Sequence, residues 1–307
     1  KIRPVVVLVK SLASALAIGT GASVGREGPI IQIGSAMGST LGEIITMPAG
    51  QRITLVAAGA GAGIAATFNT PIGGGMFAIE LMMPEVSAST FLPVALATGA
   101  ATFIGRWGLG NHPAFFVPQL ATVTSQGAAL ATLLLFATLG AITGAAAAGF
   151  VRALVFAEDT FERMHNPYLR HGLGMLGVGL LMYLLLATAG HYYVEGVGYA
   201  TVQAVLLNHL DAFGILALLF VAKLVATSVT LGSGASGGIF SPSLFMGATL
   251  GGAFGALVQL IHPMPEADIP ALAIIGMAAM VGGGTGAAMT AVTMLFEMTR
   301  DYEIVMP

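Results

Sequence analysis

Residues 25–38 read GREGPIIQIGSAMG, and residues 238–251 read GIFSPSLFMGATLG. The two stretches share one pattern, in which glycine, proline and two further glycines recur at the spacing G-x3-P-x4-G-x3-G. Proline suits the first turn of a helix, because its missing N–H would be unpaired there in any case. Each stretch therefore predicts an elbow, meaning a short glycine-containing turn that leads directly into a helix. The recurrence of the whole pattern indicates an internal repeat.

The two halves of the chain stay similar beyond these elbows. A glycine-rich stretch follows each elbow and leads to a short apolar run that ends in a glutamate, Glu80 in the first half and Glu297 in the second. The proline-to-glutamate separations are 51 and 55 residues. We expect a first copy of the repeat at about residues 1–108 and a second at about 126–307. In membrane proteins built from two such repeats, the substrate site lies where the broken helices converge.

The composition indicates a protein that resides in lipid. Of the 307 residues, 56% are hydrophobic and 8% are charged, whereas soluble domains carry about 25% charged residues. A net charge of −3 does not favour nucleic acid as a partner. There is no cysteine, and the six histidines show no metal-ligand spacing, so we expect neither a metal nor a cofactor. The sequence has no Ser/His/Asp set and no nucleotide motif near its carboxylates, so an enzyme is not expected.

Eleven apolar segments are candidates for membrane helices, and several are too short to cross a hydrocarbon core of about 30 Å. They cover residues 5–22, 29–47, 53–68, 71–83, 89–107, 127–157, 172–189, 212–231, 241–261, 271–283 and 287–298. The short segments, interrupted by glycine and proline, predict half-helices that end inside the bilayer. We expect exposed connections at 161–171 and 190–198, and close helix packing at most of the clustered glycines.

Each elbow also predicts an anion site. Backbone amides at the start of a helix, supported by the helix dipole, attract negative charge. Burying a bare ion in hydrocarbon costs tens of kcal/mol, whereas one helix terminus contributes at most about 2 kcal/mol. Several direct amide hydrogen bonds are therefore needed. A fixed lysine would bind the anion too tightly for turnover, whereas weak binding at several positions lets the ion leave.

Glu27 lies inside the first elbow, where a carboxylate is costly and therefore points to a function. One interpretation is a helix-start carboxylate that nearby amides or Arg26 satisfy. The functional interpretation is that the carboxylate occupies the amide cradle of the anion, so that protonation releases it and opens the path. Such a gate couples anion movement to protons. For Arg26, and for Lys223 within an apolar run, we expect structural roles.

These motifs together resemble the CLC family of chloride channels and chloride/proton exchangers. The two elbows match the family in order and separation, as do residues 68–71, which read FNTP, and residues 296–299, which read FEMT. The resemblance covers nearly the whole chain. One elbow alone is a weak signal, but the full set is highly specific.

The resemblance implies an all-α, polytopic protein of the cell membrane, with two inverted repeats of full and half-spanning helices. It further implies a homodimer with one pore per subunit. Chloride, as the transported ligand, would be held by backbone amides of the two elbows: Arg26, Glu27, Gly28, Ile239, Phe240 and Ser241. Glu27 corresponds to the external gating glutamate of the family. The family's serine-bearing elbow is expected before residue 1, and its coordinating tyrosine is expected after Pro307.

The chain departs from the family's exchangers at Leu81. Exchangers usually carry two glutamates at this point, the second being the inner proton acceptor, whereas this chain reads Glu80-Leu81. Leucine cannot carry a proton, so we expect chloride transport that is passive or weakly coupled to protons. The alternative is a chloride/proton antiporter in which Glu80 is the inner proton site, with Glu27 and Glu80 as the candidate proton relay. A fluoride-selective relative is a further alternative, although the chain keeps the Gly-Arg-Glu-Gly-Pro form from which that branch departs.

Overall fold

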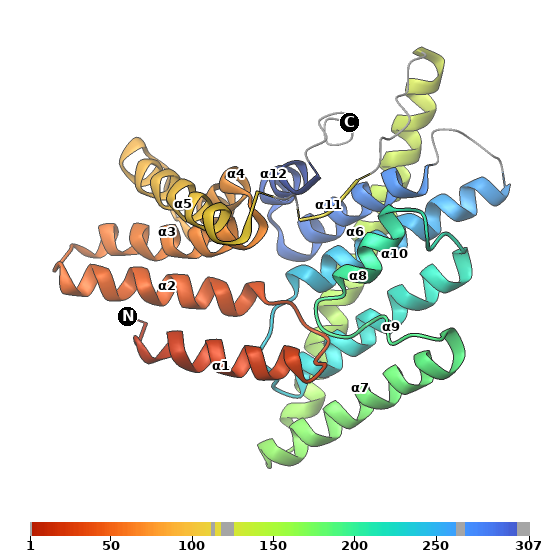
Figure 1. Cartoon of the computed structure of the whole chain (residues 1–307), viewed down its shortest axis with the longest axis horizontal. Coiled ribbons are helices and arrows are strands. Elements are labelled where there is room, and N and C mark those ends of the chain that lie inside the picture. Colours follow the sequence, from red (N-terminus) through yellow and green to blue (C-terminus); the bar gives the residue numbers. More distant parts are fainter. Residues whose placement is uncertain (1, 112–113, 118–125, 262–267, 300–307) are drawn as a thin grey trace. The chain divides into compact units, whose positions relative to one another are not determined.

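The computed structural model describes residues 2–111, 114–117, 126–261 and 268–299. Every regular element within these ranges is a helix, so the all-α prediction is confirmed for the described part of the chain. In chain order the elements (Figure 1) are α1 (Val5–Gly19), α2 (Glu27–Ile44), α3 (Ala49–Phe68), α4 (Pro71–Phe77), the π-helical turn η1 (Ala78–Met82), α5 (Ala88–Leu109), α6 (Gln126–Glu162), α7 (Pro167–Ala189), α8 (Tyr199–Leu206), α9 (Phe213–Gly232), α10 (Phe240–Ile261), α11 (Ile269–Thr285) and α12 (Ala288–Thr299).

Each of the eleven predicted segments corresponds to a helix, and the connection predicted at 161–171 is largely exposed but shorter than predicted. Helix α7 begins at Pro167, inside the stretch 161–171 that was expected to be an exposed connection. The Asn166 side chain explains the early start, because its Oδ1 accepts the amides of Tyr168 (3.0 Å) and Leu169 (3.3 Å). Helix α8 was not predicted at all, since eight residues without a strong period give little signal.

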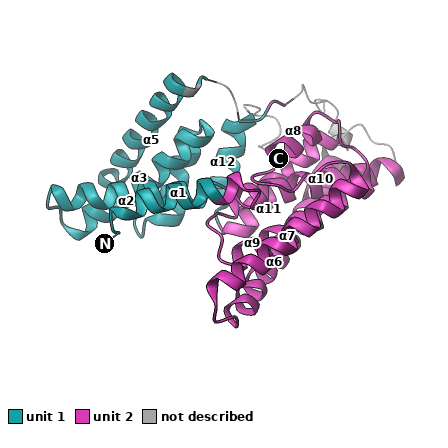
Figure 2. Ribbon diagram, turned by 60° about the horizontal axis from the view of Figure 1, so that its bottom comes forward, with its two compact units in different colours: residues 1–16, 26–115, 287–301 teal, residues 17–25, 116–286, 302–307 magenta. Residues whose placement is uncertain are grey.

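The chain forms two compact units (Figure 2). Unit 1 contains residues 1–16, 26–115 and 287–301, and unit 2 contains residues 17–25, 116–286 and 302–307. These units do not follow the two copies of the repeat. Helix α12, which ends the second copy, belongs to unit 1, where it packs against α4 of the first copy.

The glycines of the repeated pattern bring neighbouring helices into backbone contact. In unit 1, α2 packs against α3, and a Cβ at Gly34 would overlap the carbonyl oxygen of Gly59. In unit 2, α10 packs against α11, and a Cβ at Gly247 would overlap the carbonyl oxygen of Gly276. The second glycine of each pattern makes the same kind of contact one turn later. This packing is the same in both copies of the repeat. The close packing predicted for the clustered glycines is confirmed at Gly59, which meets Gly34.

Helix lengths agree with a mixture of full and half membrane crossings. Among the described residues, five helices are long and apolar enough to cross a membrane: Ala88–Gly108 of α5, Thr132–Glu162 of α6, α7, α9 and α10. Four further apolar helices are shorter, namely α1, α4 continued by η1, α11 and α12. Helix α12 has 12 residues, which at about 1.5 Å per residue covers roughly 18 Å, little more than half of a hydrocarbon core.

Each unit contains a buried cluster of side chains where its helices meet. In unit 2, the large residues Phe150, Met246 and Met280 are fully buried between α6, α10 and α11. In unit 1, three alanines and Val94 are buried between α3, η1 and α5. Small residues allow helix backbones to approach closely, as expected for helices that pack within a membrane.

Candidate functional site

The first elbow forms the start of α2 in unit 1. The helix begins at Glu27, and the amide of Ile30 donates to the carbonyl oxygen of Arg26 (3.2 Å). Pro29 therefore lies in the first turn, as predicted. Glu27 is completely buried, whereas Arg26 is exposed and Gly28 is half-buried. A buried carboxylate at this position lies at the positive end of the helix dipole, where negative charge is favoured.

The second elbow forms the start of α10 in unit 2. The helix begins at Phe240, and the amide of Ser243 donates to the carbonyl oxygen of Ile239 (2.9 Å). Phe240 and Ser241 are buried, and Ile239 is half-buried. Both helices thus begin two residues before their prolines, with the same backbone register. The sequence-based prediction of two equivalent helix starts is confirmed, with each helix beginning slightly earlier than predicted.

The glycines that open the two patterns pair with each other inside unit 2. Gly25 and Gly238 exchange both backbone hydrogen bonds, each 2.8 Å long. Next to this pair, a Cβ at Gly237 would overlap the side chain of Val24, so only glycine fits there. This pairing was not predicted, although the opening glycine shared by both patterns marked the two positions in the sequence.

Glu80 and Glu297 are arranged reciprocally in unit 1. The carboxylate of Glu80 accepts hydrogen bonds from the amide of Met289 (3.2 Å) and from the amide and hydroxyl of Thr290 (2.8 and 2.7 Å), at the start of α12. The carboxylate of Glu297, near the end of α12, accepts the amides of Ile72 (3.1 Å) and Gly73 (2.7 Å), at the start of α4. Each glutamate therefore binds the N-terminus of the other copy's half-helix.

This reciprocal arrangement holds the two half-helices together. Helices α4 and α12 lie side by side (Figure 1), and a Cβ at Gly73 would overlap the Met294 side chain. Carboxylates that accept helix-start amides are stabilising, because they satisfy unpaired donors and complement the dipole. These contacts give Glu80 a structural partner in addition to the proton role predicted for it. Its neighbour Leu81 is exposed.

Lys223 anchors the loop that joins α7 to α8. This lysine on α9 is fully buried, and its Nζ donates to the carbonyl oxygens of Val194 (3.0 Å) and Gly196 (2.7 Å). The Nζ also lies 5.1 Å from the centre of the Phe245 ring. Ser23 also holds this loop, because its hydroxyl donates to the same Val194 oxygen (2.7 Å). These contacts agree with the structural role expected for Lys223.

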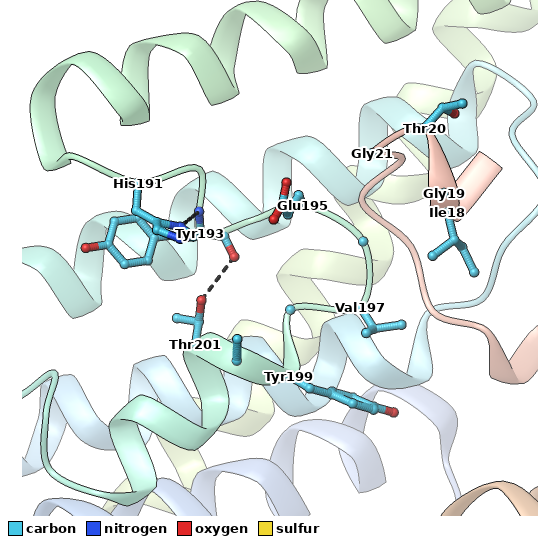
Figure 3. Close-up of a pocket in the computed structure, with 13 residues that line it drawn as sticks. Ile18, Gly19, Thr20, Gly21, His191, Tyr193, Glu195, Val197, Tyr199 and Thr201 are labelled. Atoms are coloured by element: carbon cyan, nitrogen blue, oxygen red, sulfur yellow. Dashed lines mark hydrogen bonds between the residues drawn. The ribbon is translucent and has the colours of Figure 1, made fainter. Parts of the chain in front are cut away.

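The anchored loop forms one wall of a pocket in unit 2 (Figure 3). The pocket has a volume of about 660 Å³ and lies between residues 18–21 and residues 191–201. Tyr199, at the start of α8, lines it, and its hydroxyl lies 2.8 Å from the hydroxyl of Ser241 in the second elbow. The pocket wall is therefore connected by a side-chain hydrogen bond to a residue of the predicted anion site.

The family model for voltage-gated chloride channels matches residues 1–307, the full chain. The chain belongs to this family. A relative named the H(+)/Cl(−) exchange transporter ClcA, from Vibrio parahaemolyticus, is 34% identical over all of this chain and 66% of its own length. The chain spans about two thirds of the length of the curated relatives it matches.

Solved structures of the family have the same fold. A slow cyanobacterial Cl⁻/H⁺ antiporter aligns with a TM-score of 0.84 and 29% identity, covering 97% of this chain and 68% of its own. A CLC-type fluoride/proton antiporter aligns with a TM-score of 0.78 and 27% identity, covering 94% of this chain and 69% of its own. The CLC fold and a multi-pass membrane location are thereby established for the family member described here.

Proposed function

We propose that the protein containing this chain exchanges chloride for protons across a membrane. The sequence alone favoured passive or weakly coupled transport, because Leu81 stands where an inner proton acceptor was expected. The comparisons support its alternative, exchange, since a similar relative and a similar solved structure are both named as chloride/proton exchangers. Coupled exchange is therefore the function to be tested.

The observation that carries the proposal is the buried Glu27 at the first residue of α2. Burying a carboxylate costs free energy, so a glutamate kept in this position points to a function. When ionised, it competes with chloride for the helix-start amides of Arg26, Glu27 and Gly28. When protonated, it no longer needs them, and chloride takes its place. When Glu27 alternates between these two states, it carries a proton and controls whether chloride can bind. The two ion movements are thereby coupled.

The second elbow supplies equivalent amides without a carboxylate. Ile239, Phe240 and Ser241 occupy the positions corresponding to Arg26, Glu27 and Gly28, and none of them can be ionised. Chloride bound by these amides is held by neutral donors, which keeps binding weak enough for release. The proton therefore acts at the first elbow, and chloride is bound at both.

The test is a flux measurement on the full-length protein in liposomes. A chloride gradient is imposed, chloride efflux is recorded with an electrode, and proton uptake is recorded with a pH-sensitive dye. Wild-type protein is expected to take up protons as chloride leaves, and Glu27→Gln is expected to move chloride without protons. Chloride efflux with no proton uptake in the wild type would contradict exchange and leave passive conduction.

The inner proton site needs a separate comparison, for which Glu80 remains the candidate. Glu297 is its matched control, because both carboxylates bind the start of a half-helix in unit 1. If Glu80 carries the proton, Glu80→Gln loses proton uptake while Glu297→Gln retains it. Equal proton uptake in the two variants would assign Glu80 to helix capping alone.

Anion selectivity and assembly complete the proposal. The resemblance in fold to a fluoride/proton antiporter makes fluoride the competing substrate, and efflux of fluoride and chloride from the same liposomes distinguishes the two. We expect chloride to be preferred, because the Gly-Arg-Glu-Gly-Pro form is retained.

The implied homodimer remains a prediction, which the mass of the purified protein tests directly.

A further inference from the structure

We propose that Tyr199 positions the hydroxyl of Ser241 at the second elbow and thereby sets the affinity and selectivity for anions there. The inference rests on the proposed function, since it assumes that the amides around Ser241 bind chloride. The observation is the 2.8 Å contact between the Tyr199 and Ser241 hydroxyls. Ser241 is fully buried at the second residue of α10, and Tyr199 is half-buried in the wall of the pocket.

The backbone that precedes Tyr199 contacts two neighbouring helices. Gly198, which precedes it, has a φ of +77° and caps α8 in the left-handed region. A Cβ at this glycine would press against the Phe245 ring of α10. Two residues earlier, the carbonyl oxygen of Gly196 accepts a hydrogen bond from buried Lys223 on α9 (2.7 Å). These contacts hold the backbone at the start of α8 against α9 and α10.

The side chains point in the direction that this role requires. In Figure 3 the Tyr199 hydroxyl is turned away from His191, which lies at the opposite end of the pocket. The ring edge lines the pocket, while the hydroxyl reaches Ser241 in α10. Tyr199 therefore connects the pocket of unit 2 with the second elbow, although it belongs to neither motif found in the sequence.

The chemistry of the hydroxyl pair explains the effect on anions. A hydroxyl carries one donor and two acceptor lone pairs, so one hydrogen bond between the two groups uses only one of their two protons. When Tyr199 donates to Ser241, the serine proton is directed to another acceptor, such as an anion at the elbow amides. Without the tyrosine, the serine oxygen can turn towards amides of the first helical turn, as serines at helix starts do. The serine would then compete with the anion for these donors.

The expected loss follows from the energy of one hydrogen bond. A neutral hydrogen bond contributes about 0.5–1.5 kcal/mol, so removing the Tyr199 hydroxyl should weaken chloride binding about two- to tenfold. Anions that depend less on a directed donor should lose less. We therefore expect the preference for chloride over nitrate to fall in the same variant.

Isothermal titration of the full-length protein with chloride tests this inference, using Tyr199→Phe, Ser241→Ala and the double variant. Ser241→Ala keeps the backbone amide and removes only the hydroxyl. We expect both single variants to weaken binding to a similar extent, and the double variant to be no weaker than either. Tyr193→Phe is the matched control, because Tyr193 lines the same pocket and its hydroxyl donates to Ala189 at the end of α7 (3.4 Å). Unfolding temperatures verify that each variant is folded.

The outcomes separate this inference from the proposed function. If the wild type binds chloride and Tyr199→Phe binds it equally well, the inference is overturned and the proposed function stands. Losses that multiply in the double variant also overturn it, because the two hydroxyls would then act independently. Failure of the wild type to bind chloride overturns both. Should Tyr199→Phe not fold, an unchanged affinity in Ser241→Ala would overturn the inference.

Discussion

The α2–α3 hairpin of unit 1 and the α10–α11 hairpin of unit 2 are two versions of one design. Both begin at an elbow two residues before a proline, and both place glycine against the backbone of the following helix. They differ in the three residues between the opening glycine and the proline. The first hairpin places a buried carboxylate there, and the second places a buried serine held by a tyrosine.

The residues that the two hairpins share determine their packing, and the residues that differ determine the chemistry of their helix starts. The shared glycines and prolines determine how each hairpin packs, because a side chain larger than hydrogen cannot fit between the helices. The variable residues lie at the helix starts, where the amides can bind an anion. The same scaffold can therefore carry an ionisable group in one copy and a neutral hydroxyl in the other. The predictions below test whether the two copies are equivalent where their packing is the same and distinct where their contacts differ.

The largest effect is expected from the glycines that both hairpins share. Gly34→Ala and Gly247→Ala each place a Cβ against a backbone carbonyl oxygen of the neighbouring helix, which cannot move as a side chain can. We expect both variants to lose about 3 kcal/mol of stability or more, and to give little monodisperse protein. The measurement is thermal unfolding in detergent.

Matched controls for the glycine variants lie on α5 and α6. Gly99 and Gly140 have open space where a Cβ would be added, so Gly99→Ala and Gly140→Ala should fold normally. A stable Gly247→Ala protein beside an unfolded Gly34→Ala protein would mean that the two hairpins are not packed equivalently.

Replacing Lys223 should produce the next largest effect, and only in unit 2. Lys223→Met leaves the carbonyl oxygens of Val194 and Gly196 without this donor in a buried place. We expect a loss of about 2–3 kcal/mol, together with faster hydrogen exchange in the loop between α7 and α8. Arg152→Met on α6 removes an exposed charge of the same sign and should leave stability unchanged. An undisturbed loop in Lys223→Met would refute its role as an anchor.

The reciprocal glutamates should show equal effects of intermediate size. Glu80→Gln and Glu297→Gln each remove a charge that interacts with helix-start amides, and we expect each to cost about 1–2 kcal/mol. Chemical unfolding of the two purified variants is the measurement. A loss in one variant alone would show that the arrangement is not reciprocal in energy, although it is reciprocal in geometry.

The smallest effect compares two serines at equivalent positions, two residues before the opening glycines. Ser23 donates to Val194 (2.7 Å), whereas among the described residues the buried hydroxyl oxygen of Ser236 has no hydrogen-bond partner. Ser23→Ala should therefore cost about 1 kcal/mol, and Ser236→Ala should be neutral or slightly stabilising. Unfolding temperatures measured side by side test this difference, and equal losses would contradict it.

Much of the molecule could be predicted because local patterns determine where helices begin. The proline and glycine spacing predicted both elbows, and the short apolar runs predicted α4 and α12 as half-helices. The functional role of Glu27, inferred because a carboxylate in an apolar elbow is costly, stays a prediction. The exposed connection expected at 161–171 was predicted too long, since Asn166 and Pro167 were not recognised as a helix start.

Other features could not be predicted, because they depend on contacts between distant parts of the chain. Glu80 and Thr290 are 210 residues apart in sequence, and Glu297 and Gly73 are 224 apart. The repeat showed that the two glutamates are equivalent. It did not show that each would bind the half-helix of the other copy. The Tyr199–Ser241 contact had no signal at all, since α8 itself was not predicted.

The sequence by itself determined that the protein lies in lipid, that it contains a repeat, and where its helices start. These follow from composition and from residues within a few positions of one another, which act on the backbone directly. The tertiary structure alone decided which donor meets which acceptor: Glu80 with Thr290, Tyr199 with Ser241, and Lys223 with Val194. A hydrogen bond requires two atoms within about 3 Å, and only the folded path of the whole chain brings such partners together.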